Sequence, residues 1–442
     1  MFFDLMTRQK KDHTSPQKMG KSVMETLSPH DAGNETAFYL STANVSAFVK
    51  GLPAKTQFAL RSLTQLESGS LTLQMPDKRI VKTVGKSPGP DATLILHNWN
   101  IVHKALTSST IGVAESYMDG DWESPDVTAF LELLVVNEDV GNTVTNYARG
   151  LLVTFEKLRH WWRSNSRGQA KKNISAHYDL GNDFYAQWLD KTMTYSSALF
   201  EEGNDDLASA QTAKYRALAE AADIQRSDRV LEIGCGWGGF AEYAAAELDC
   251  HVTGLSLSRE QLKYAEERLA KRGLSDKVDF KYQDYRDEKG VYDAVISIEM
   301  FEAVGEAYWP VYFDKIKQCL KQGGKAGIQV ITITPENYAT YRENPDFIQR
   351  YIFPGGMLPS DDALPDLGLA ADLKTLSNRE FGLDYARTLA EWREEFWANW
   401  ATIEPLGFDE RFKRLWEFYL FYCEAGFRAG NINVRQIVYE NA

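Results

Sequence analysis

A glycine-rich stretch is the first part of this chain whose residue types and spacing could do chemistry. Residues 229–240 read Arg-Val-Leu-Glu-Ile-Gly-Cys-Gly-Trp-Gly-Gly-Phe, an apolar run followed by four glycines and the start of a helix. Glycine lacks a Cβ, so the backbone of such a turn can bend sharply and lie flat against a ligand. The pattern predicts a buried strand, a turn and a helix that together hold a cofactor.

The residues around this turn distinguish two classes of cofactor. A dinucleotide site places an acid on the ribose about 20 residues after the glycine turn. Here the second expected strand, residues 251–258, ends in hydroxyls at Ser256 and Ser258, and Gln261 follows without an acid. Together with Glu232 inside the first strand, this favours S-adenosylmethionine over NAD. The alternative is a purely structural turn of an α/β domain.

Strands and helices alternate on both sides of the turn. Further strands are expected over residues 278–282, 293–298 and 326–331, with helices between them. This alternation predicts an α/β fold with a doubly wound, Rossmann-like parallel sheet, in which ligands bind outside the carboxyl ends of the strands. We therefore expect one crevice bordered by Ser196, Gly234, Ser256, Gln261, Asp284, Glu302 and Gln329.

The whole chain divides into four segments by composition. Residues 1–35 are polar and predict a disordered lead. Residues 36–130 contain short strand-like runs and predict a smaller N-terminal α+β domain, either a scaffold or a lipid-handling or dimerisation domain. Residues 131–171 predict a helical basic linker, and residues 172–442 the main domain. Proline- and glycine-rich residues, about 335–385, form an insertion beyond the core pattern of the sheet.

Charge and cysteine content exclude several classes of protein. A formal net charge of −13 argues against nucleic-acid binding, which depends on Lys and Arg. The four cysteines form no CxxC pair, so neither a disulfide framework nor a metal site is suggested, and a reducing, cytoplasmic location is expected. No apolar run of about 18 residues occurs, so any membrane contact must be peripheral.

A basic stretch could make such a membrane contact. Residues 156–172 hold six Lys or Arg against one acid, and Trp161 and Trp162 lie among them. Cations beside tryptophans suit the headgroup layer of an anionic membrane. A solvated interdomain linker is the alternative interpretation.

Six motifs follow one another along the chain, at residues 177–183, 193–197, 231–238, 254–261, 300–305 and 423–428. As an ordered set they resemble the motifs of the cyclopropane-fatty-acyl-phospholipid synthases and mycolic-acid methyltransferases. The resemblance covers about residues 172–440 and is weaker in the N-terminal domain. It implies S-adenosylmethionine-dependent transfer of a methylene or methyl group to the cis double bond of an unsaturated phospholipid acyl chain. The insertion would then help to form an acyl tunnel at the inner membrane face, and a homodimer is possible.

The resemblance also implies individual cofactor contacts. Among them, Ser256 and Gln261 would contact the ribose, and Asp284 and Tyr285 would lie near the adenine. The full set is Tyr195, Ser196, Gly234, Gly236, Gly238, Ser256, Gln261, Asp284 and Tyr285.

An active-site bicarbonate is the second ligand that the resemblance implies. Glu302, Ile331 and Tyr385 match its expected ligands, whereas Ser197 stands in place of a cysteine and Gln329 in place of a histidine. The serine matters little where the backbone makes the contact. Gln329 matters more, because an amide donates a hydrogen bond but cannot buffer a proton.

The expected chemistry needs shielding from water and a base. Alkene attack on a sulfonium methyl leaves a carbocation on the acyl chain, which aromatic faces can stabilise. Glu302, with bicarbonate and Tyr385, is the best candidate to accept or relay a proton. Glu299 could be a second carboxylate or an ion-pair partner. Cys423 matches a cysteine proposed as catalytic in the family, but this chemistry needs no thiolate, which favours a packing role.

The sequence is also compatible with other functions. Because Gln329 could alter proton removal, the product could be a methyl-branched unsaturated chain or furan fatty acid precursor instead of a cyclopropane. A lipid carrier with an inactive methyltransferase fold and a small-molecule methyltransferase are the other candidates.

Overall fold

The computed structural model describes residues 37–137, 180–201, 203 and 206–442. The expected disordered lead and most of the basic linker, with Trp161 and Trp162, lie outside these residues. So does the beginning of the first motif, residues 177–179.

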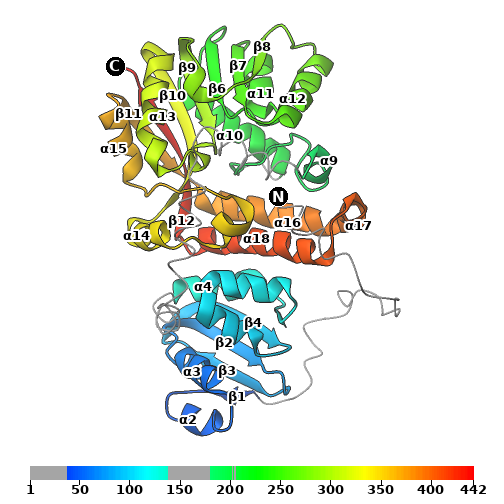
Figure 1. The fold of residues 1–442 in the computed structure, drawn as a ribbon. Helices are drawn as coiled ribbons and strands as arrows, with labels where there is room; N and C mark the ends of the chain where they lie inside the picture. The colour runs from blue at the N-terminus through cyan, green and yellow to red at the C-terminus, as the bar shows by residue number, and fades with distance from the viewer. Residues whose placement is uncertain (1–36, 138–179, 202, 204–205) are drawn as a thin grey trace.

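A seven-stranded sheet forms the centre of the main domain (Figure 1). Its five parallel strands have the order β10-β9-β6-β7-β8. This confirms the predicted Rossmann-like α/β fold. The strands are β6 (Arg229–Ile233), β7 (His251–Ser256), β8 (Val278–Tyr282), β9 (Tyr292–Ile298) and β10 (Leu320–Ile333).

Two strands from the end of the chain complete this sheet. β12 (Ile432–Glu440) pairs antiparallel with β10 along nine residues and lies between β10 and β11 (Lys374–Glu380). The pattern of alternating strands and helices did not predict this pair.

Helices cover the sheet and connect its strands (Figure 1). The Asp206 side chain caps the N-terminus of α10 by accepting a hydrogen bond from the backbone N–H of Ser209. The Ser258 side chain caps α12 in the same way, by accepting from the backbone N–H of Gln261. The helices are α9 (Asn182–Tyr185), α10 (Leu207–Ala221), α11 (Gly239–Glu247), α12 (Arg259–Lys271), α13 (Trp309–Cys319), α14 (Pro335–Glu343) and α15 (Ala363–Ala370). Single turns lie at η2 (Tyr285–Asp287), η3 (Phe301–Ala303), η4 (Glu306–Tyr308), η5 (Ile348–Ile352) and η6 (Glu404–Leu406).

The N-terminal domain is a five-stranded sheet with helices, as predicted for an α+β unit. The strand order is β1-β3-β2-β4-β5. Its elements are β1 (Phe38–Tyr39), α2 (Val45–Phe48), α3 (Ala54–Leu63), β2 (Ser68–Gln74), β3 (Ile80–Val84), β4 (Ser87–Leu96), α4 (Asn100–Met118), β5 (Trp122–Glu123) and α5 (Val127–Val136).

A helical layer lies between the two sheets (Figure 1). It consists of α16 (Gly382–Ala398), the short α17 (Trp400–Ile403) and α18 (Glu410–Arg428). α18 packs against α16 on one side and against α4 and α5 of the N-terminal domain on the other. Trp392 and Trp416 are buried in this layer together with Phe184 and Trp188 of the main domain. The two domains therefore share one apolar core.

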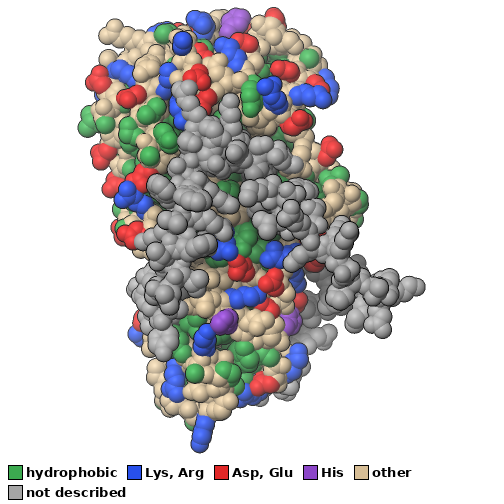
Figure 2. All heavy atoms as spheres, in the orientation of Figure 1, with side chains coloured by type: hydrophobic (Ala, Val, Ile, Leu, Met, Phe, Trp, Pro, Cys, Tyr) green, Lys and Arg blue, Asp and Glu red, His purple; other side chains and the backbone are tan. Residues whose placement is uncertain are grey.

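The face of the molecule that Figure 2 shows carries charged side chains of both signs among the described residues. Figure 2 shows Lys, Arg, Asp and Glu side chains interspersed over the described parts of both domains. Among the described residues, no helix is both long enough and apolar enough to cross a bilayer.

A buried ion pair joins the helical layer to the N-terminal domain. The Glu424 side chain is fully buried, and its Oε2 accepts hydrogen bonds from Arg393 Nη1 and, at 3.1 Å, from Thr128 Oγ1 of α5. Arg428 Nη2 lies 2.5 Å from Glu424 Oε1. These contacts tie α5, α16 and α18 together.

We predict that Glu424→Ala lowers the free energy of unfolding by about 3–5 kcal/mol, because it leaves the mostly buried Arg393 guanidinium without its partner. Urea denaturation measures this loss. The double variant Arg393→Met/Glu424→Leu removes both charges and should lose less. Equal losses in the two variants would contradict the assignment of the effect to the stranded charge.

Candidate active site

The glycine turn is held against the end of the neighbouring strand. The backbone N–H groups of Gly234 and Cys235 both donate to the Leu255 carbonyl at 2.9 Å. Gly238 has φ +80°, and a Cβ there would lie 2.9 Å from the Ala265 Cβ. Gly236 has φ +49°, and a Cβ there would meet no atom within 4 Å. The turn thus packs closely on the α12 side and faces open space at Gly236.

Polar groups border this space at the end of β7. Ser256 Oγ donates to Gln261 Oε1 at 3.2 Å and accepts a hydrogen bond from the Ser258 N–H at 3.1 Å. The hydroxyl and the amide are therefore held side by side, where the sequence analysis placed a ribose. Open space at Gly236 and these polar groups fit S-adenosylmethionine.

The expected adenine contacts already have protein partners. Both carboxylate oxygens of Asp284 accept from Arg286, at 2.8 Å and 2.6 Å. The Tyr285 ring packs against Tyr312 with 5.5 Å between centroids. Their roles at the cofactor stay predictions.

Tyr195 and Ser196 lie on the other side of the site. The Tyr195 hydroxyl is hydrogen-bonded to the Tyr419 hydroxyl at 2.8 Å. Ser196 Oγ accepts a hydrogen bond from Lys214 Nζ at 2.6 Å. Burial lowers the pKa of Lys214 to about 7, and this side chain is fully buried.

A single carboxylate, that of Glu299, binds three of the five groups that were expected around a bicarbonate. Glu299 directly follows β9, and its Oε1 accepts from the Ser197 N–H and from Gln329 Nε2, each at 2.8 Å. Its Oε2 accepts from the Tyr385 hydroxyl at 2.7 Å. Glu299 has φ +49°, a left-handed conformation that is uncommon for residues other than glycine. Such strain persists only where the surrounding structure fixes it, as it does in many active sites.

Glu302 lies one turn further on, in η3, and has fewer partners. Its Oε1 accepts from the Ile331 N–H at 2.6 Å, whereas its Oε2 is buried without a hydrogen-bond partner. Burial, reinforced by the charge of Glu299, raises the pKa of Glu302 to about 8. Glu302 therefore carries a proton at neutral pH, and that proton belongs on the unpartnered Oε2.

Glu299 has a different environment. Burial raises its pKa, while the Lys214 ammonium and the three donors oppose that rise. Hydrogen bonds to the charged form of a carboxyl favour that form. We therefore assign the ionised state to Glu299 and the neutral state to Glu302, a division of roles typical of paired carboxyls.

A bicarbonate does not fit this arrangement. Ser197, Gln329 and Tyr385 are brought together as expected, but their donors all point to Glu299. Tyr385, which was expected to act together with Glu302 and a bicarbonate, donates its hydroxyl hydrogen bond to Glu299. The Gln329 carbonyl oxygen is also engaged, because it accepts from Gln436 Nε2 at 3.1 Å.

A cavity of about 880 Å³ begins at the two glutamates and extends into the N-terminal domain. Its walls are mainly apolar. Tyr195, Phe353 and Tyr385 are among the aromatic residues that line it. On the N-terminal side, each of α3, β2, β4, α4 and α5 contributes at least one leucine, including Leu60, Leu71, Leu94, Leu106 and Leu131.

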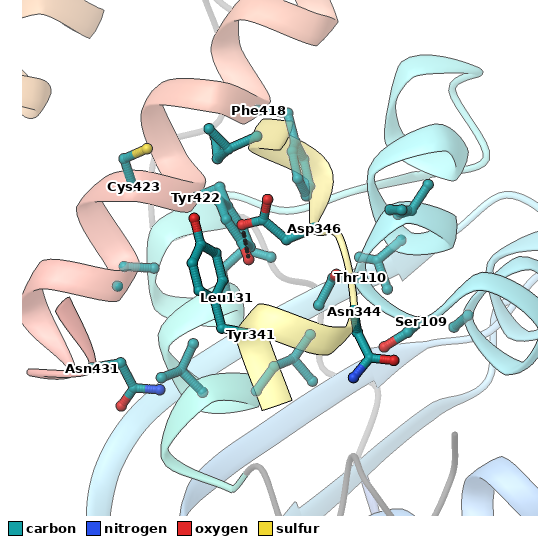
Figure 3. A pocket seen from close by; sticks show the side chains of 18 of the residues that line it. Ser109, Thr110, Leu131, Tyr341, Asn344, Asp346, Phe418, Tyr422, Cys423 and Asn431 are labelled. Atoms are coloured by element: carbon teal, nitrogen blue, oxygen red, sulfur yellow. Dashed lines mark hydrogen bonds between the residues drawn. The ribbon is translucent and has the colours of Figure 1, made fainter. Parts of the chain in front are cut away.

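Polar side chains, among them Asp346 and Tyr422, also line the cavity (Figure 3). Asp346 Oδ2 accepts from the Tyr422 hydroxyl at 3.3 Å, and burial raises the pKa of Asp346 to about 6. Ser109 and Thr110 line the cavity where α4 is kinked and are exposed, as are the lining residues Thr340 and Glu343 of α14.

Cys423 also lines the cavity (Figure 3). Burial raises the pKa of its thiol far above the ordinary value, so the nucleophilic thiolate is disfavoured. This agrees with a packing role.

Sequence reasoning set Glu299 aside and did not consider Lys214. Glu299 follows a parallel strand directly, at the edge of the sheet where ligands bind, and this position was the available signal. Lys214 gave no comparable signal, because its burial depends on how α10 packs.

Comparison with known proteins places the chain in a family. The family model for mycolic acid cyclopropane synthetase matches residues 165–437. The chain belongs to this family. It is 42% identical to the tuberculostearic acid methyltransferase UfaA1 of Mycobacterium tuberculosis, over 74% of this chain and 78% of that protein. It is 34% identical to the cyclopropane-fatty-acyl-phospholipid synthase of Escherichia coli K12, over 79% and 87% of the two chains.

Solved structures agree with this assignment. Mycolic acid cyclopropane synthase CmaA1, in a complex with SAH and CTAB, matches with a TM-score of 0.57 and 28% identity, over 61% of this chain and 98% of that one. The cyclopropane synthase MmaA2 from Mycobacterium tuberculosis matches with a TM-score of 0.58 and 27% identity, with the same coverage. The chain is thus an S-adenosylmethionine-dependent methyltransferase of the cyclopropane fatty acid synthase family.

We predict that a carboxylic acid C=O band in the infrared spectrum titrates with a midpoint near pH 8 and is missing in Glu302→Gln. Below this pH Glu302 is protonated, and above it the band is lost as the carboxylate forms. The glutamine matches the neutral side chain in shape, so cofactor affinity should stay within about threefold, or 0.7 kcal/mol. Glu232, whose pKa burial also raises to about 8, keeps its own band in the variant, so the two proteins are compared by difference spectra. A difference spectrum without this band, or a midpoint near the usual pKa of about 4.3, would contradict this assignment.

Proposed function

We propose that this enzyme transfers a one-carbon unit from S-adenosylmethionine to the cis double bond of an unsaturated phospholipid acyl chain and closes a cyclopropane. The observation that carries this proposal is the apolar cavity that ends at Glu299 and Glu302. A small polar substrate would gain nothing from such a wall of leucines, whereas each buried methylene of an acyl chain contributes about 0.8 kcal/mol.

The N-terminal domain takes part in holding the chain. Five of its elements line the cavity, so an acyl chain whose double bond lies at the glutamates would extend into this domain. We place the entry at the kink of α4, near Ser109 and Thr110. This is the lipid-handling role considered for the domain.

Bound S-adenosylmethionine supplies an electrophilic methyl group on sulfur. The π electrons of the alkene form the new C–C bond, the S–CH₃ bond breaks with its electrons on sulfur, and the acyl chain becomes a carbocation. Tyr195, Phe353 and Tyr385 offer ring faces at this end of the cavity and exclude water. Loss of a proton from the new methyl then leaves its C–H electron pair to close the ring.

A second candidate differs only in which proton leaves. Removal of a proton from a neighbouring chain carbon leaves its C–H electron pair to form a C=C bond, which gives a methyl-branched unsaturated product without a ring. Two observations favour it: Gln329 cannot buffer a proton, and the 42% identical relative is a tuberculostearic acid methyltransferase.

The product decides between these candidates. The purified protein is incubated with S-adenosylmethionine and vesicles of a cis-monounsaturated phospholipid, and the acyl chains are examined by mass spectrometry and proton NMR. A gain of one CH₂ with upfield ring signals supports the cyclopropane. Vinylic methyl signals support the branched product, and no mass gain would reject both.

We also propose peripheral contact with an anionic membrane on its cytoplasmic side. An acyl chain must leave the bilayer to reach the cavity, and residues 156–172 supply cations and tryptophans for such a contact. Vesicle flotation with and without anionic lipid tests this, and equal binding to neutral vesicles would contradict it. Homodimer formation stays a prediction.

We predict that Ala59→Phe, which narrows the cavity from α3, raises the KM for vesicle phospholipid about tenfold, since overpacking costs about 1–3 kcal/mol. Ala59 lines the cavity, whereas Ala54 on the same helix is exposed and does not. Ala54→Phe is therefore the matched control and should leave KM unchanged. Equal effects in the two variants would contradict an acyl path through the N-terminal domain.

A further inference from the structure

We propose that Glu299 is the catalytic base and that its carboxylate fills the place of a free bicarbonate, so that the reaction needs no added anion. This inference rests on the proposed function and names the group that takes the proton. Glu299 lines the cavity at the place where the double bond of the acyl chain would lie, so it can reach the reacting carbons directly.

Three chain segments contribute the donors. Ser197 lies in the loop before α10, Gln329 on β10 and Tyr385 on α16, and all three donate to the Glu299 carboxylate within 2.7–2.8 Å. Without this side chain, they would surround a space lined by donors, which is an anion site. With the Glu299 side chain in place, all three donors are hydrogen-bonded to its carboxylate.

The Glu299 backbone is fixed to present the side chain there. Its N–H donates to the Gln329 carbonyl at 2.8 Å, and its φ of +49° turns the chain sharply at the end of β9. A glycine would adopt this conformation without strain. A glutamate that keeps this strained conformation therefore indicates that residue 299 is present for its carboxylate and not for the shape of the turn.

Gln329 also fits an internal carboxylate. Its Nε2 donates to Glu299 Oε1 at 2.8 Å and to the Ser197 carbonyl at 3.3 Å, while Gln436 fixes its oxygen. An amide in this orientation is a permanent donor that does not titrate. The proton is then left to the carboxylate, with the Lys214 ammonium as the opposing charge.

The proton transfer balances without a further reagent. The cationic acyl chain gives one C–H proton to a Glu299 oxygen, and the electron pair of that bond forms the last C–C bond of the product. Glu299 becomes a neutral carboxylic acid, and it loses the proton to solvent after the product leaves.

The first test concerns the need for added anion. In buffer freed of carbon dioxide, wild-type turnover should change less than twofold when bicarbonate is added. Glu299→Gln should lose about 10²–10⁴-fold in kcat, the usual contribution of a positioned base. Calorimetric binding of S-adenosylmethionine shows that each variant is folded. Loss of wild-type activity without bicarbonate, or near-normal activity of Glu299→Gln, would overturn the proposal.

The second test removes the Glu299 carboxylate, so that an added anion can bind in its place. Glu299→Ala frees the three donors, so bicarbonate or formate should restore its turnover at least tenfold, whereas the bulkier Glu299→Gln should not be rescued. Asp346→Ala is the matched control, because it removes a buried carboxyl of the same cavity that Gln329 and Tyr385 do not hold. Bicarbonate should not stimulate that variant.

Binding separates this inference from the proposed function. Carbon-13-labelled bicarbonate should show NMR line broadening with Glu299→Ala and none with the wild type, whether or not the lipid is a substrate. If the wild type modifies no phospholipid but this difference is seen, the proposed function fails. The inference that the Glu299 carboxylate occupies the anion site is then still supported. A folded Glu299→Ala that binds no bicarbonate, or a wild type that does, would contradict the inference.

Discussion

The hydrogen bonds around the Glu299 carboxylate are the interaction on which the active site depends. A buried charge is unstable unless it is paired and hydrogen-bonded. Here a loop, a strand and a helix each give one donor to it, and Lys214 provides a positive charge nearby. The same contacts fix the end of the apolar cavity. The hydrogen bonds that stabilise the Glu299 charge therefore also determine the shape of the site.

The helical layer of α16 and α18 makes the remainder of the site possible. α16 carries Tyr385 to Glu299, and α18 carries the wall residues Tyr419 and Cys423 while packing on the N-terminal domain. Because Arg393 and Glu424 bind α5 to this layer, the two domains enclose a common cavity. A separated N-terminal domain would expose the apolar walls to water, which the hydrophobic effect opposes.

Much of the fold follows from local patterns in the sequence. The alternating apolar runs and helices around the glycine turn sufficed to predict the parallel sheet and the edge where Ser256, Gln261 and Glu302 lie. β11 and β12 were not foreseen, because their pairing is antiparallel and joins segments far apart in the chain. Such contacts leave no local periodicity. The cavity across the domain boundary is likewise a product of tertiary packing.

The active site shows the same limit at the level of single residues. Matching the sequence to family motifs brought Ser197, Gln329 and Tyr385 into one set, and the structure also gathers them. It could not show which atom they face, because Glu299 and Glu302 are three residues apart and chemically identical. Their environments separate them: Glu299 has three donors, whereas Glu302 has one backbone donor and an unpartnered oxygen. Hydrogen bonding and burial, and not residue type, thus determine which glutamate holds the proton and which can accept one.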